Sequence, residues 1–162
     1  MIIGSEYKLC FIIDRVPEWE DEAYKNGIMF VSLGTHIYPD TLRTTTLNMD
    51  LCYAVEDDSP FMKPVIDPVL YELEKDQLFK TIYEITYPED IEKDNDYKYE
   101  WPFQEIMDAG FVIFSVSDGN KIKILAGKAP FDETYPVDLI ELDMEDYLSI
   151  TKELKEYVDQ NF

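Results

Sequence analysis

Carboxylate side chains are the chemistry-bearing groups that this chain has in quantity. Of its 162 residues, 35 are Asp or Glu and 14 are Lys or Arg, so the formal net charge is −21. Carboxylates in such numbers could bind calcium, act in pairs as catalytic acid and base, or bind a basic protein surface. Many of the acids lie in three segments. The first, 18–22, contains Glu18, Glu20, Asp21 and Glu22 with Trp19 among them. The second is Glu56, Asp57 and Asp58, and the third, 89–96, contains Glu89, Asp90, Glu92, Asp94 and Asp96.

The third acidic segment does not fit the template of a calcium-binding loop. An EF-hand loop that began at Asp90 would need glycine at its sixth position and a bidentate Glu at its twelfth. These positions hold Asn95 and Trp101. A looser divalent-cation site stays open as an alternative, but the pattern itself predicts no metal.

Other catalytic patterns are missing from the sequence. The one histidine, His36, lies in a turn-like "GTHIY" segment that favours a structural role. No nucleophile elbow, phosphate-binding glycine loop or dinucleotide fingerprint occurs. Cys10 and Cys52 lie in separate apolar runs, which indicates reduced core residues rather than a disulfide or a zinc site. We therefore expect no enzymatic activity and no cofactor.

The net charge limits the possible partners. Nucleic acid and anionic membranes would both repel this surface, whereas a cationic protein would be attracted. A need for solubility alone, or a halophilic host, could also produce such a charge. The opening "MIIGSEYKLCFIIDR" lacks the basic start of a signal peptide, and no stretch reaches the length of a membrane span. We expect a cytoplasmic protein.

The elements that position the acids are predicted to be mostly strands. Hydrophobic residues make up 46% of the chain, enough for one domain over residues 1–162. Two principal helices are expected, over 68–85 after the capping pair Asp67-Pro68 and over 151–160. The fold class is therefore α+β with a mainly antiparallel sheet. Alternation and turn signals predict strands over 1–14, 28–33, 36–39, 45–55, 111–117, 121–127 and 137–150.

Four aromatic residues follow the third acidic segment at alternate positions: Tyr97, Tyr99, Trp101 and Phe103. The alternation predicts a strand over 97–103, on which all four rings would lie on one face. A face that covers the core is the favoured interpretation, and exposed anchors for a partner are the alternative. We predict that 89–96 is an exposed acidic loop and that the rings attach it to the sheet.

Several segments, taken in order, resemble a known family. They are "MIIG", "YKNGIMFVSLG" with "IYP" after it, "TTTLNMDL", "YEITYPEDIEKDNDYKYEWPF" and "FVIFSVSDGNKIKILAGK". The set resembles immunity family forty-two of the bacterial polymorphic-toxin and contact-dependent growth inhibition systems, from residue 1 to about 160. The resemblance implies a small cytoplasmic protein that binds and neutralises a cognate toxin domain. It supplies no catalytic motif, and no toxin-contacting residue transfers by position.

Charge and resemblance together give a working hypothesis. Many toxins of these systems are nucleases, and an acidic inhibitor can occupy the basic surface that a nuclease uses for phosphates. We predict that the three acidic segments form the face that occludes such a toxin, with 89–96 as the first candidate. The alternative is an acidic adaptor or chaperone-like module for another basic protein.

Overall fold

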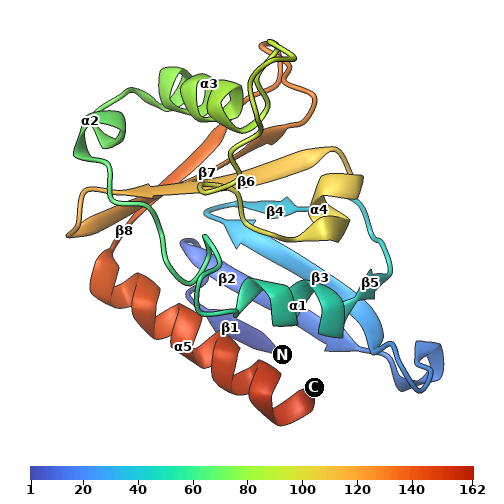
Figure 1. The fold of residues 1–162 in the computed structure, drawn as a ribbon. Helices are drawn as coiled ribbons and strands as arrows, with labels where there is room; N and C mark the ends of the chain where they lie inside the picture. Colours follow the sequence, from blue (N-terminus) through green and yellow to red (C-terminus); the bar gives the residue numbers. More distant parts are fainter.

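Two antiparallel sheets carry the fold in the computed structural model, which describes residues 1–162 (Figure 1). The first sheet has the order β1-β2-β3-β4, with β5 also paired to β3, and the second has the order β6-β7-β8. The strands are β1 (Ile2–Gly4), β2 (Leu9–Arg15), β3 (Asn26–Leu33), β4 (His36–Tyr38), β5 (Thr45–Thr46), β6 (Phe111–Ser117), β7 (Lys121–Lys128) and β8 (Asp138–Asp143). The helices are α1 (Leu47–Ala54), α2 (Pro68–Tyr71), α3 (Lys75–Thr86), α4 (Gln104–Asp108) and α5 (Met144–Asn161), with a short 3-10 helix, η1 (Pro17–Trp19).

The predicted hairpins are confirmed, because their turns are specified locally. Between β6 and β7, the Asp118 carboxylate accepts the backbone N–H groups of Asn120 and Lys121, each at 2.8 Å. Gly119 adopts a φ of 103°, which only glycine reaches without strain. The β3–β4 hairpin turns in the same way at Gly34, whose φ is 64°.

The strand predicted over 45–55 is wrong beyond its first two residues. Thr45–Thr46 pair with β3, and the chain then forms α1. Leu47 and Leu51, one helical turn apart, are both fully buried, whereas Met49 and Tyr53 are 39% and 52% exposed. The apolar residues of this run fit a period of two and a helical period equally well, and packing against the core selects the helix. Cys52 is consequently exposed rather than a core residue, while Cys10 is buried as expected.

The single helix predicted over 68–85 is two helices, α2 and α3. The start is confirmed, since Asp67 Oδ1 accepts the N–H of Leu70 at 3.0 Å. The break follows Tyr71, because the Lys123 ammonium of β7 donates to the carbonyl oxygens of Tyr71 and Leu73 at the end of α2. This contact satisfies carbonyls that have no partner within the helix.

The last helix begins earlier than predicted. The strand predicted over 137–150 is too long, because β8 ends at Asp143 and α5 already starts at Met144. The reason is a change of period: from Tyr147 onward the buried residues recur at helical spacing through Ile150 and Leu154.

Two hydrophobic clusters occupy the two faces of the second sheet. The larger lies between the sheets and includes Phe11 of β2, Ile113 of β6 and residues of α1 and α5. The smaller joins Phe114 of β6 to Phe79 of α3. Because both faces are covered, every residue of β6 is buried.

Candidate functional site

Residues 89–96 form an exposed loop, as predicted. The loop leaves the end of α3 and lies at the top of the view in Figure 1. Asp90 folds it locally by accepting the N–H of Glu92 at 3.0 Å. Asp96 pairs with Lys98 at 3.0 Å, and this hydrogen bond lowers the pKa of Asp96. The remaining acids of the loop, Glu89, Glu92 and Asp94, are exposed and form no ion pair.

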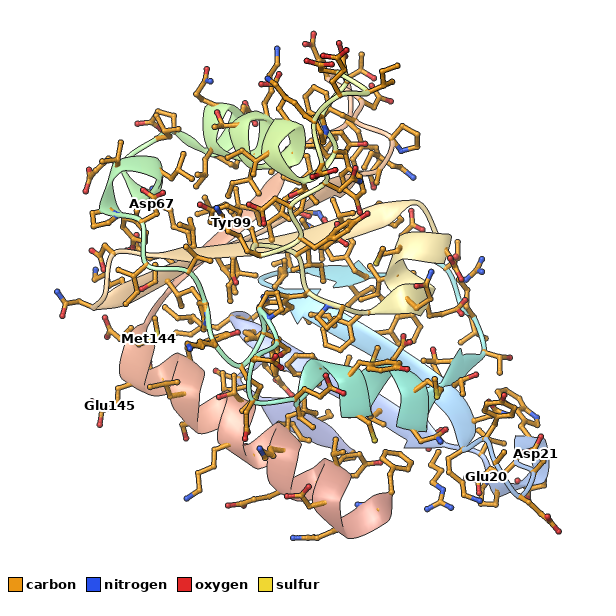
Figure 2. The ribbon with its side chains drawn as sticks, viewed as in Figure 1. Glu20, Asp21, Asp67, Tyr99, Met144 and Glu145 are labelled. Carbon is orange, nitrogen blue, oxygen red and sulfur yellow. The ribbon has the colours of Figure 1, made fainter.

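Residues 18–22 contain two acids that hold their own loop in place. Glu20 receives a two-pronged hydrogen bond from the Arg15 guanidinium, which lowers the pKa of Glu20, and its side chain is only 10% exposed. The Asp21 carboxylate accepts the N–H groups of Ala23 and Tyr24 at 2.8 and 2.7 Å. Figure 2 shows both acids at the lower right, on the loop that joins β2 to β3.

The other residues of 18–22 face solvent. Glu18 and Glu22 are exposed without an ion pair, and the Trp19 side chain is 46% exposed. Trp19 belongs to η1, a single helical turn within this acidic loop. Its ring is therefore available as a surface anchor.

Residues 56–58 follow α1 and turn toward α5. Asp57 accepts a hydrogen bond from the Lys155 ammonium, which lowers the pKa of Asp57. Glu56 and Asp58 are exposed and unpaired. The three acidic segments thus lie at separate places on the molecule and do not merge into one continuous face (Figure 1).

A groove of ≈ 660 Å³ lies between α1 and the 97–108 segment, and we call it the aromatic–acidic groove. Its large side chains are unusually exposed for their type: Tyr24 by 49%, Met49 by 39%, Tyr53 by 52% and Tyr97 by 52%. Met49 and Tyr53 stand one turn apart on the solvent side of α1, so their side chains are neighbours. Exposed aromatic side chains in a concavity are typical of binding sites.

The charged side chains that line the aromatic–acidic groove are all carboxylates: Asp50, Glu100, Glu105 and Asp108. Asp50 and Glu100 are each 5% exposed, and neither has a basic partner. Asp50 Oδ2 accepts the N–H of Glu105 at 3.1 Å, and burial raises the pKa of Asp50 to about 6. Glu100 accepts the Tyr87 hydroxyl, and burial raises its pKa as well. Apart from Glu105, which pairs with Arg43, the carboxylates of the groove have no basic partner within the protein.

The pKa of Asp50 predicts a pH-dependent stability. The folded state binds this proton more tightly than the unfolded state, in which the pKa of Asp50 is the ordinary 3.8. The free energy of unfolding therefore falls as the pH rises from about 4 to about 6, and the full loss is present above pH 6. We expect Asp50→Asn, which can still accept the Glu105 N–H, to raise the free energy of unfolding by about 1–3 kcal/mol near neutral pH. The gain should shrink as the pH falls toward 4. Urea unfolding at several pH values measures this, and a gain that is the same at every pH would contradict it.

The segment 97–103 is not the strand predicted from its alternating rings. The segment lies along β6, to which two backbone hydrogen bonds connect it. Trp101 N–H donates to the Ile113 carbonyl at 2.9 Å, and Ser115 N–H donates to the Tyr99 carbonyl at 3.0 Å. A turn closed by Glu100 N–H on the Tyr97 carbonyl, at 3.0 Å, breaks the alternation. The four rings therefore do not share a face.

The four rings have three different surroundings. Trp101 and Phe103 lie in the larger cluster, whereas Tyr99 lies in the smaller one, beneath α3 (Figure 2). Tyr97 remains exposed at the groove. Three rings thus attach the acidic loop to the core, as predicted, and the fourth, Tyr97, lies on the surface.

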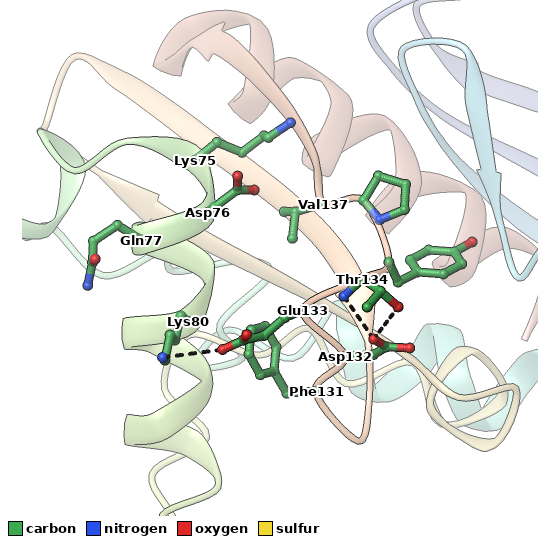
Figure 3. Close-up of a pocket in the computed structure, with 11 residues that line it drawn as sticks. Lys75, Asp76, Gln77, Lys80, Phe131, Asp132, Glu133, Thr134 and Val137 are labelled. Carbon is green, nitrogen blue, oxygen red and sulfur yellow. Dashed lines mark hydrogen bonds and ion pairs between the residues drawn. The ribbon is translucent and has the colours of Figure 1, made fainter.

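A second pocket, of ≈ 420 Å³, lies between α3 and residues 131–137 (Figure 3). Its charges are mixed, and only one ion pair joins two of them. Lys80 lies 3.6 Å from Glu133, and Asp132 accepts the hydroxyl of Thr134 at 2.7 Å. No group of three or more His, Cys, Asp or Glu side chains is placed to hold a metal ion. None of the helices has the length and apolar character needed to cross a membrane.

The fold and the groove define a small α+β protein with an acidic surface and exposed aromatic anchors. A family model described as Immunity protein 42 matches residues 1–157, so the chain belongs to this family of immunity proteins. The fold is shared with a solved structure described as the crystal structure of CdiI from Burkholderia dolosa AUO158. The TM-score is 0.77 at 18% sequence identity, over 97% of this chain and 99% of that chain. No curated protein matches the chain. The expected family and fold class are thereby confirmed.

The groove could not be recognised directly in the sequence. Its lining comes from separate segments around Tyr24, α1, Pro60 and residues 97–108. The one signal lies in the run 45–55, since a helical period places Met49 and Tyr53 together on a polar face. Large apolar side chains on such a face indicate a contact surface.

Proposed function

We propose that this chain neutralises a cognate toxin domain in the cytoplasm by binding it, and that the bound toxin surface is basic. The observation that carries the proposal is the large excess of carboxylates without a basic partner. The ten ion pairs of the structure engage only nine of the 35 acids. Membership in an immunity protein family and the CdiI fold support the toxin as the partner.

A nuclease is the toxin class that best fits this charge. Enzymes that cleave nucleic acids bind phosphates with lysine and arginine, and an acidic inhibitor competes for the same surface. Opposite potentials raise association rate constants to about 10⁸–10⁹ M⁻¹s⁻¹, which suits the interception of a lethal enzyme. Protection at low toxin levels needs a Kd of about 1 nM, or roughly −12 kcal/mol.

Coexpression with the toxin domain encoded beside this chain tests the proposal. We expect cells that carry both proteins to survive, and the purified proteins to form a complex in which the toxin is inactive. Death of the cells together with no complex would show that the function is wrong. If the toxin is neutralised but leaves DNA and RNA intact, neutralisation stands and the nuclease class is wrong.

A further inference from the structure

We infer that the aromatic–acidic groove receives an arginine or lysine side chain of the toxin, together with apolar residues beside it. The inference rests on the proposed function and specifies which surface performs it. The groove combines the two things that such a side chain needs, which are apolar walls for its stem and carboxylates for its charged end.

The helix that carries two of the apolar side chains, and the ring of a third, are held in place before any partner arrives. Met49 and Tyr53 project from α1, whose opposite side is fixed in the core by Leu47 and Leu51. Tyr97 packs on the Tyr87 ring with 5.9 Å between centroids, and its hydroxyl accepts a hydrogen bond from Asn95 Nδ2 at 2.9 Å. Side chains that are already ordered lose little entropy on binding, which favours affinity.

The carboxylates supply the charge complementarity. Asp50 and Glu100 are buried without a cation, so an incoming guanidinium would find uncompensated negative charge in a desolvated site. Close charge pairs in a desolvated interface can couple strongly, and removing one partner then leaves the other charge buried and unpaired. A cation over Tyr53 or Tyr97 would also be attracted by the negative face of the ring. Arg43 is already paired with Glu105 of this lining.

The three acidic segments meet the groove at its rim. Tyr24 lies two residues after Glu22, Pro60 lies two residues after Asp58, and Tyr97 follows Asp96 directly. Two residues span at most about 7 Å, so one end of each segment borders the groove. The segments form no continuous face, and Glu89 and Asp90 line a different pocket, but one end of each segment lies within two residues of the groove lining.

Two of the bases close to this rim are paired with acids, whereas Lys63 and Lys93 form no ion pair. Lys25 pairs with Glu20 at 3.9 Å, and Lys98 pairs with Asp96 at 3.0 Å. The unpaired acids of the segments keep the potential over the groove negative. This field would steer a cationic side chain toward the groove before contact.

Affinity measurements with the toxin domain test the groove. We expect Tyr53→Ala to raise the Kd about 10–100-fold, mainly through faster dissociation, because it removes an aromatic anchor. We expect Glu100→Gln, which keeps the shape and still accepts the Tyr87 hydroxyl, to raise the Kd about tenfold. Thermal unfolding of each variant verifies that the fold is retained.

Matched controls lie on α5, away from the groove lining. Leu148→Ala removes an apolar side chain that is 48% exposed on a helix, as Tyr53 is at 52%. Glu153→Gln removes one exposed carboxylate. We expect both controls to change the Kd less than about threefold, because exposed charges at a distance are screened.

The outcomes distinguish failure of the groove from failure of the proposed function. If the unaltered chain does not bind the toxin, the proposed function fails. If it binds but Tyr53→Ala binds equally well, only the groove is overturned. If Tyr53→Ala weakens binding and Glu100→Gln does not, an apolar anchor occupies the groove and the cationic side chain is ruled out.

Discussion

Replacing Trp101 with alanine is expected to lower the free energy of unfolding by about 3–5 kcal/mol. The indole is 1% exposed and packs on the rings of Phe11, Phe61 and Tyr147. Its Nε1–H donates to Ser115 Oγ at 2.9 Å, so the substitution leaves both a cavity and a buried hydroxyl without its partner. Urea unfolding followed by far-ultraviolet circular dichroism measures the change.

Tyr97→Ala is the matched control from the same stretch. Its ring is 52% exposed, so we expect a loss below about 1 kcal/mol in stability. The contrast tests the division of the aromatic stretch into buried support and exposed surface. Equal losses for the two variants would show that the division is wrong.

The second large effect is expected in the rate of toxin binding. The triple variant Asp90→Lys, Glu92→Lys and Asp94→Lys reverses charge on the exposed loop without touching the core. We expect its association rate constant to fall about 10–100-fold at low ionic strength, with a weaker dependence on salt. Stopped-flow mixing with the toxin domain measures both quantities.

A control with the same change in net charge makes this result interpretable. Lysine at Glu145, Glu153 and Asp159 reverses three acids of α5 instead. Because steering depends on charge near the contact, we expect the α5 variant to slow association less than the loop variant. Equal slowing would place the contact away from 89–96, and the segments 18–22 and 56–58 would be tested next.

The parts of the fold that were predicted correctly are those specified by a few adjacent residues. Asp118-Gly119 defines its hairpin through side-chain and backbone bonds within four residues, and Asp67-Pro68 likewise starts α2. The strand prediction over 45–55 is wrong because Leu47 and Leu51 satisfy both periods. The break after α2 depends on Lys123, which is more than fifty positions away in sequence, so no local pattern could indicate it.

The acidic segments show a second limit of prediction from sequence. Glu20 and Asp57 look like free surface charges in the sequence, but the first is held by Arg15 and the second by Lys155. Both bases are identified only when the chain is folded. Each segment ends within two residues of the groove lining, at Tyr24, Pro60 or Tyr97, and these three residues are brought together by tertiary structure alone.

The most direct test of toxin neutralisation by an acidic surface is the association rate of the unaltered chain with the toxin domain, measured over a range of salt concentrations. We predict a complex in which the toxin is inactive. We also predict a rate constant that reaches at least about 10⁸ M⁻¹s⁻¹ at low salt and falls steeply as salt is added. No binding, or binding at a rate that salt does not change, would contradict neutralisation by an acidic surface.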